Sequence, residues 1–233
     1  MKRHLLILLS AAALASSQGA LAQMMGHGNT SGAMGDWEFR IGPVFTESKN
    51  VEFKGGSTAD VDSTTGIRVG TGYYVTDQFI VGMNFGWAQS SFNGVVQSGH
   101  PGTSAVIENG HVDFSTLMFD ATYLLPLQGA IKPFAVAGLG WNWINTNIAA
   151  GPPQYGCWWD PWWGYVCTGY QPTHGANSFA YQAGAGVQIN FTRTFNISVD
   201  YRYTWIDLNN ANGTPGFGAI GLMFNWRFPS YHY

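Results

Sequence analysis

Apolar and polar residues alternate one by one over long stretches of this chain, most regularly near its C-terminal end. Between Phe195 and Trp205, apolar and aromatic side chains occupy the odd positions, and Asn, Ser, Asp, Arg and Thr occupy the even ones. Residues 181–191 and 219–228 repeat this alternation. Because successive side chains of a β-strand point to opposite faces, each stretch predicts a strand with one aromatic, apolar face and one polar face.

The same pattern predicts five more strands toward the N-terminus, at residues 36–45, 63–74, 79–90, 112–124 and 132–143. Short connections at 75–78, 125–131 and 192–194 alternate with long ones at 46–62, 90–111, 145–177 and 207–216. Transmembrane barrels combine short periplasmic turns with long external loops in this way. The predicted fold class is therefore all-β, an eight-stranded antiparallel up-and-down transmembrane β-barrel.

Composition favours a membrane-facing surface over a water-soluble barrel. Charged residues make up 10% of the chain, against roughly 25% in soluble domains. A soluble lipocalin-type barrel would turn its apolar residues inward, whereas here glycine shares a face with Arg, Asp, Gln and Asn. The formal net charge of −3 gives no basic excess for nucleic-acid binding.

The N-terminus has the features of an export signal. Lys2 and Arg3 precede an apolar run that is too short for a membrane helix, and Ala20-Leu21-Ala22 supplies a cleavage motif. The predicted organisation is a signal peptide at 1–22, a flexible N-terminal segment at 23–35, the barrel at 36–228 and a C-terminal extension at 229–233. The predicted location is the bacterial outer membrane, reached through a cleaved signal peptide.

Several charged residues fall on the polar, inward faces of the predicted strands. They are Glu38, Arg40, Arg68, Asp120, Asp200, Arg202 and Arg227. Buried charges must pair or stay hydrated, and an eight-stranded lumen is about wide enough for side chains alone. A polar network that fills the lumen is therefore expected, and a narrow ion pathway gated by breaking such pairs is the alternative.

The longest predicted external loop contains both cysteines, Cys157 and Cys167. In an exported chain they predict a disulfide, worth on the order of 3 kcal/mol in the chain-entropy model. Between them an Asp-Pro turn signal interrupts a run of aromatic residues, Trp158, Trp159, Trp162, Trp163 and Tyr165. These rings either pack on each other or lie at the lipid headgroups, or they form an external contact surface for a host ligand, glycan or lipopolysaccharide.

An enzyme is also considered, because His111, Asp113 and Ser115 share one face of a predicted strand. Nucleophilic catalysis requires a serine within hydrogen-bond reach of a histidine. Residues two apart on a strand are separated by about 7 Å, so the constellation is loose. No catalytic residue, metal site or cofactor is predicted.

Four stretches resemble the OmpA-like β-barrel superfamily, in particular its small opacity-type and outer-membrane immunogenic proteins. They are residues 132–140 (KPFAVAGLG), 183–187 (AGAGV), 199–203 (VDYRY) and 221–228 (GLMFNWRF). The last looks like the family's assembly signal, read from Phe228 or from Tyr233, since the chain continues past Phe228. The resemblance implies periplasmic chaperones and the barrel-assembly machinery as partners during biogenesis.

Together these observations predict a non-enzymatic outer-membrane barrel that contributes to envelope structure and presents surface loops for external contacts. A small channel or a carrier of small hydrophobic molecules is the alternative, and an outer-membrane lipid hydrolase is the third candidate. Outer-membrane lipid and lipopolysaccharide are expected partners by location, with an external ligand possible and no nucleic acid.

Overall fold

The computed structural model describes residues 33–54, 56–97, 104–152, 154–171, 173–208 and 211–230. Strands and their connections make up these residues, and they include no helix that is long and apolar enough to cross a membrane. The predicted signal peptide at 1–22 lies outside the described residues, as do residues 23–32 and 231–233, so that part of the domain organisation stays a prediction.

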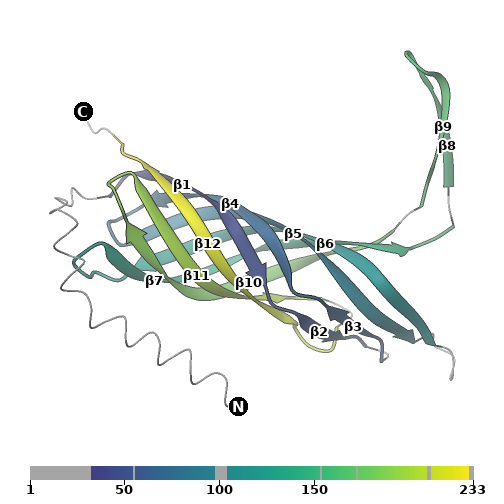
Figure 1. The fold of residues 1–233 in the computed structure, drawn as a ribbon, viewed down its shortest axis with the longest axis horizontal. Helices are drawn as coiled ribbons and strands as arrows, with labels where there is room; N and C mark the ends of the chain where they lie inside the picture. The colour runs from purple at the N-terminus through teal and green to yellow at the C-terminus, as the bar shows by residue number, and fades with distance from the viewer. Residues whose placement is uncertain are drawn as a thin grey trace.

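Eight antiparallel strands form the closed barrel that the alternation predicts, and this fold class is confirmed. The ring consists of β1 (Trp37–Thr46), β4 (Thr64–Tyr74), β5 (Phe79–Gln97), β6 (Ser104–Leu124), β7 (Ile131–Ala149), β10 (Thr173–Asn190), β11 (Phe195–Ile206) and β12 (Gly216–Phe228). The first and last strands close it, with Trp37 opposite Phe228. Figure 1 shows the strands running obliquely around the barrel, with the short turns gathered at one end.

Alternation decides which side chains face the surroundings. Along β5, the predicted outward residues Phe79, Val81, Met83, Phe85 and Trp87 are all exposed, whereas Asn84 between them is buried. This arrangement gives a broad apolar exterior and a polar interior, the reverse of a water-soluble barrel. The outer surface therefore matches a lipid environment.

The strands on the long-loop side are longer than the alternation predicts. β5 runs to Gln97 and β6 starts at Ser104, so most of the predicted loop at 90–111 is paired strand, and that loop assignment is wrong. The predicted loop at 145–177 likewise contains the end of β7 and the start of β10. In the outer part of β5 the outward residues are polar, whereas Ser90 and Phe92 face inward and are buried. Backbone pairing therefore continues there without an apolar outer face to mark it.

A small hairpin extends the barrel wall at the same end. β2 (Lys49–Glu52) and β3 (Thr58–Val61) form within the predicted loop at 46–62, and β3 pairs with the outer part of β5. Asn212, from the connection between β11 and β12, donates its backbone N–H to the Glu52 carbonyl at 2.8 Å. The first and last external connections are thereby joined into one structure.

A second hairpin stands apart from the barrel. β8 (Gln154–Asp160) and β9 (Gly164–Tyr170) form their own two-stranded sheet between β7 and β10. In Figure 1 this hairpin runs across the long axis of the barrel rather than along it. Gln171 closes its base by donating a side-chain hydrogen bond to the Gly151 carbonyl at 3.2 Å.

Candidate functional site: the barrel lumen and the outer hairpin

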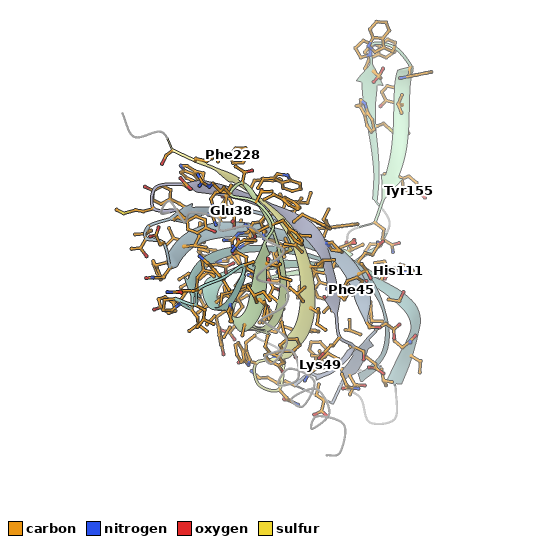
Figure 2. All side chains as sticks on the ribbon, turned by 60° about the vertical axis from the view of Figure 1, so that its left-hand side comes forward. Glu38, Phe45, Lys49, His111, Tyr155 and Phe228 are labelled. Atoms are coloured by element: carbon orange, nitrogen blue, oxygen red, sulfur yellow. A yellow bond between two sulfur atoms is a disulfide. The ribbon has the colours of Figure 1, made fainter. Side chains whose placement is uncertain are left out.

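The structure turns all seven predicted lumen residues inward. Six of them are buried, with Glu38, Asp200 and Arg202 among the least exposed, and Arg227 is half-buried at the short-turn end. Figure 2 labels Glu38 on the barrel, near Phe228. The seven residues divide into two hydrogen-bonded groups, named below for the carboxylates at their centres.

The Asp120 cluster comprises Asp120, Asp200, Arg68, Arg202, Gln182 and Asn84. Arg202 joins the two carboxylates, donating from Nη1 to Asp120 at 2.8 Å and from Nε to Asp200 at 3.1 Å. Arg68 Nη1 donates to Asp200 at 3.0 Å. Gln182 Nε2 donates to Asp120 at 2.5 Å, and Asn84 donates to the same carboxylate. Five strands thus contribute to one continuous network across the lumen.

The Glu38 cluster lies nearer the short-turn end. Glu38 accepts hydrogen bonds from Arg40 Nε at 2.7 Å, the Tyr74 hydroxyl at 2.9 Å and Asn196 Nδ2 at 3.0 Å. Arg227 Nη2 donates to the Tyr74 hydroxyl at 2.8 Å, and its guanidinium carbon lies 4.5 Å from the centroid of the Tyr74 ring. Tyr74 therefore links Glu38 to Arg227, although these two residues form no ion pair with each other.

Charge is nearly balanced within the lumen. Arg40, Arg68 and Arg202 each form an ion pair with a carboxylate, at distances of 2.7 to 3.1 Å. Among the described residues Arg227 has no carboxylate within ion-pair distance, and the Tyr74 ring and hydroxyl stabilise it instead. Removing one member of a buried pair leaves the other uncompensated, which costs about 3–5 kcal/mol.

Glycine makes room for these charged side chains. A Cβ atom on Gly138 of β7 would lie 2.1 Å from Asp120 Oδ1, and one on Gly70 of β4 would lie 2.1 Å from Asn84 Oδ1. Both distances are too short for any side chain. The glycine-rich inner face thus follows from the volume that the Asp120 cluster requires inside a narrow barrel.

Apolar side chains pack together at both ends of the polar network. At the short-turn end, Ala33, Tyr74, Ile80, Leu124, Phe134 and Val136 form one buried cluster. Ala33 is held there because its backbone N–H donates to Asp77 Oδ1 at 2.5 Å. At the other end, Met118, Ala180 and Ile206 pack with Leu208 and Phe217. The polar network therefore lies between two apolar layers.

The space between the two clusters is small. A cavity of about 10 Å³ lies between the two clusters and is bordered by Glu38, Asn84, Asp200 and Asn225. The side-chain oxygens of Asn84 and Asn225 are buried there without a protein hydrogen-bond partner. This volume is close to the smallest that holds one water molecule.

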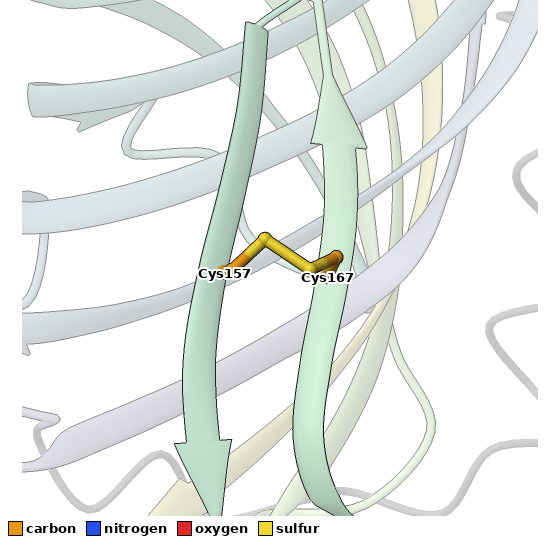
Figure 3. The surroundings of a disulfide bond; sticks show 2 residues. All are labelled: Cys157 and Cys167. Atoms are coloured by element: carbon orange, nitrogen blue, oxygen red, sulfur yellow. A yellow bond between two sulfur atoms is a disulfide. The ribbon is translucent and has the colours of Figure 1, made fainter.

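The disulfide prediction is confirmed in the outer hairpin. Cys157 of β8 and Cys167 of β9 are opposite each other in the sheet and are bonded (Figure 3). At the hairpin turn, Asp160 Oδ1 accepts the backbone N–H groups of Trp162 at 2.8 Å and Trp163 at 3.0 Å. Gly164 takes a positive φ of 77°, which its lack of a side chain permits. The hydrogen bonds of Asp160 thus hold the hairpin at its turn, and the disulfide holds its two strands together.

The five aromatic residues between the cysteines are all exposed. Trp162 and Trp163 at the tip are 88% and 82% exposed, and Trp158, Trp159 and Tyr165 on the strands are also accessible. Within the described part of the chain, no ring-to-ring contact involves these five. The expectation that the rings pack on each other is therefore not met, and their role as a contact surface stays a prediction.

The structure does not assemble the weighed triad of His111, Asp113 and Ser115. All three lie on the outward face of β6, in line with the lipid-facing Leu117 and Phe119, and no side-chain hydrogen bond among the described residues joins them. The described residues also contain no group of three or more His, Cys, Asp or Glu side chains that could hold a metal ion.

A closed eight-stranded barrel with an aromatic, apolar exterior and a polar interior defines an integral outer-membrane β-barrel protein. The comparison with protein families agrees. The family described as "Outer membrane protein beta-barrel domain" matches residues 5–228, so the chain belongs to this family. No curated protein matches the chain.

The chain is also similar to several solved structures. Neisserial surface protein A is 14% identical with a TM-score of 0.52, and the match covers 84% of this chain and 99% of that one. OprG from Pseudomonas aeruginosa is 15% identical with a TM-score of 0.48, over 84% and 97% of the two chains. Ail, the attachment invasion locus protein of Yersinia pestis, is 15% identical with a TM-score of 0.48, over 84% and 99%. At these identities the similarity concerns the fold alone.

Proposed function

We propose that this protein is a non-enzymatic, non-conducting outer-membrane barrel that contributes to envelope structure and presents its outer strands and loops for external contacts. The sealed lumen carries this proposal. Two charged clusters occupy the centre of the barrel, and a cluster of apolar side chains packs at each end. A barrel of this kind acts through its walls and its outer surface, because its interior is occupied.

The filled lumen argues against the channel and carrier alternatives. An ion that crossed the barrel would have to separate Arg202 from Asp120 and Asp200, and then pass the apolar layers at both ends. A small hydrophobic molecule needs a pocket of several hundred Å³, far more than the cavity of about 10 Å³. Neither activity is accommodated without rearrangement of the interior.

The outer end supports the second half of the proposal. β5 and β6 continue as a paired ladder beyond the barrel, β3 adds to their edge, and Asn212 ties the last connection to Glu52. This ordered wall holds loops away from the membrane, where external molecules reach them. Biogenesis through periplasmic chaperones and the barrel-assembly machinery is part of the same proposal and rests on the family.

Liposome swelling tests the proposal. The full chain is reconstituted in phospholipid vesicles after its heat-modifiable gel migration shows that it is folded, and the influx of small sugars is followed by light scattering. The expected rate is that of protein-free vesicles. Hydrolysis of the vesicle phospholipid is measured in the same samples, and none is expected. Solute influx from folded barrels, or released fatty acid that is lost on Ser115→Ala, would contradict the proposal.

A further inference from the structure

The outer hairpin leaves an unusual amount of aromatic surface in solvent. Tyr155, Trp158, Trp159, Trp162, Trp163 and Tyr165 are between 49% and 88% exposed. Figure 2 shows the tip of the hairpin, where the sticks of several rings gather, far from the barrel wall. Apolar surface that is exposed and contiguous marks a site of contact with another molecule or with a membrane.

The chemistry of the hairpin indicates an aromatic, interfacial contact rather than an ionic one. Residues 154–170 contain no Lys, Arg or His, and their only acidic residue is Asp160. The Asp160 carboxylate is turned toward the backbone N–H groups of Trp162 and Trp163. A surface without cations has no electrostatic attraction for an acidic polymer. Trp and Tyr are instead the residues that concentrate at the lipid–water interface.

Aromatic side chains occupy every side of the hairpin. Trp159 is opposite Tyr165 on the face that carries the disulfide, and Trp158 is opposite Val166 on the other face. Neighbours in a strand point to opposite faces, so a partner that covered one face would leave Trp158 or Trp159 in water. An interface that surrounds the tip buries both.

The hairpin is connected to two strands that carry lipid-facing aromatic side chains. It is inserted between β7 and β10, whose outward residues Trp141 and Phe179 have ring centroids 6.0 Å apart. On the next strand pair, Tyr181 stacks with Trp205 at 5.3 Å. These rings lie toward the long-loop end of the barrel wall, where an aromatic belt meets the outer leaflet.

The hairpin is long enough for its tip to reach back to the membrane. From Trp143 to Ala149, β7 climbs roughly 15 Å above the belt, given a rise of about 3.3 Å per residue and a tilt near 40°. Each hairpin strand has 7 residues and spans roughly 23 Å. Because the hairpin runs across the barrel axis (Figure 1), its length is directed sideways over the surrounding membrane.

We propose that the hairpin is a lateral membrane anchor. Trp162 and Trp163 at its tip enter the lipid–water interface of the outer leaflet that surrounds the barrel, and the disulfide and the Asp160 turn hold the tip rigid. The anchor limits tilting of the barrel in the membrane. This inference needs an intact barrel in a bilayer but does not depend on a sealed lumen, so the two proposals fail separately.

Site-selective fluorescence quenching tests the anchor. The full chain is placed in phosphatidylcholine nanodiscs, and the emission of the Trp162→Ser/Trp163→Ser variant is subtracted from that of the unaltered protein. The difference isolates the tip from the other tryptophans. Brominated phosphatidylcholine within the nanodisc is expected to quench it, and aqueous iodide is expected to leave it largely unquenched. Brominated lipid in separate vesicles is expected to have no effect.

A matched control places a tryptophan where no anchor is expected. Val106, on the outer part of β6, is 65% exposed, and a Val106→Trp variant in the double-serine background should be quenched by iodide and not by brominated lipid. Each other outcome at the tip overturns the anchor. Iodide quenching alone places the tip in water, quenching only by separate vesicles assigns it to an opposing membrane, and protection from both quenchers assigns it to a protein contact.

Discussion

Replacing Asp120 with alanine removes the carboxylate at the centre of the larger lumen cluster. Arg202 then loses the hydrogen bond from its Nη1 to Asp120, at 2.8 Å, and keeps only the one from its Nε to Asp200. The amides of Gln182 and Asn84 also lose their acceptor inside the barrel. Breaking one side of a buried ion pair costs about 3–5 kcal/mol, and each orphaned buried donor costs about 1–3 kcal/mol. Since the remaining side chains can partly rearrange and recover some of this energy, we expect the free energy of unfolding to fall by about 3–5 kcal/mol.

Reversible urea unfolding in phospholipid vesicles, followed by tryptophan fluorescence, measures this loss. Asp113→Ala is the matched control, because it makes the same change on the same strand but at a half-exposed outward position, where an effect within about 0.5 kcal/mol is expected. A double-mutant cycle with Arg202→Met should give a coupling energy of about 0.5–3 kcal/mol. If Asp120→Ala is no more destabilising than Asp113→Ala, the cluster does not hold the lumen together and the reasoning is wrong.

Three further predictions concern other parts of the structure. Tyr74→Phe removes the hydroxyl that joins a buried carboxylate to a guanidinium, so the same urea assay should show a loss of about 1–3 kcal/mol; an unchanged midpoint would count against this role. Cys157→Ser/Cys167→Ser should leave the free energy of barrel unfolding unchanged, because the hairpin is a separate sheet. Chymotrypsin should nevertheless cut the hairpin of this variant faster, since isolated hairpins are only marginally stable. Met83→Arg should lower the free energy of unfolding by about 2–4 kcal/mol, because Met83 lies on the lipid-facing side, midway along the membrane part of β5. Leu127→Arg, in an exposed turn, should lower it little.

The lipid-facing surface could be predicted from the sequence, because contact with lipid requires an apolar side chain at every second residue of a strand. Phe79, Met83 and Trp87 had to be apolar to face lipid, and the period of two follows directly. The outer ends of the strands carry no such constraint. Around Ser90, Ser91 and Asn93 the outward residues of β5 are polar, so its pairing with β6 is not marked by an apolar outer face.

Side-chain direction in the lumen was predictable, but hydrogen-bond partners were not. Alternation places Asp120 and Arg202 inside, yet they are 82 residues apart and meet only because of the stagger between strands in the closed barrel. Tyr74 was missed because a tyrosine suits a membrane-facing girdle as well as a lumen. Its position on the same face of β4 as Arg68 was the available signal.

Recording of single-channel currents from the refolded protein in planar bilayers tests the sealed lumen most directly. Samples are first shown to be folded by their heat-modifiable migration on a denaturing gel, so that silence cannot come from unfolded protein. The two charged clusters and the two apolar layers predict a folded barrel that inserts and carries no current. Steady, discrete current steps from such samples would contradict the sealed lumen.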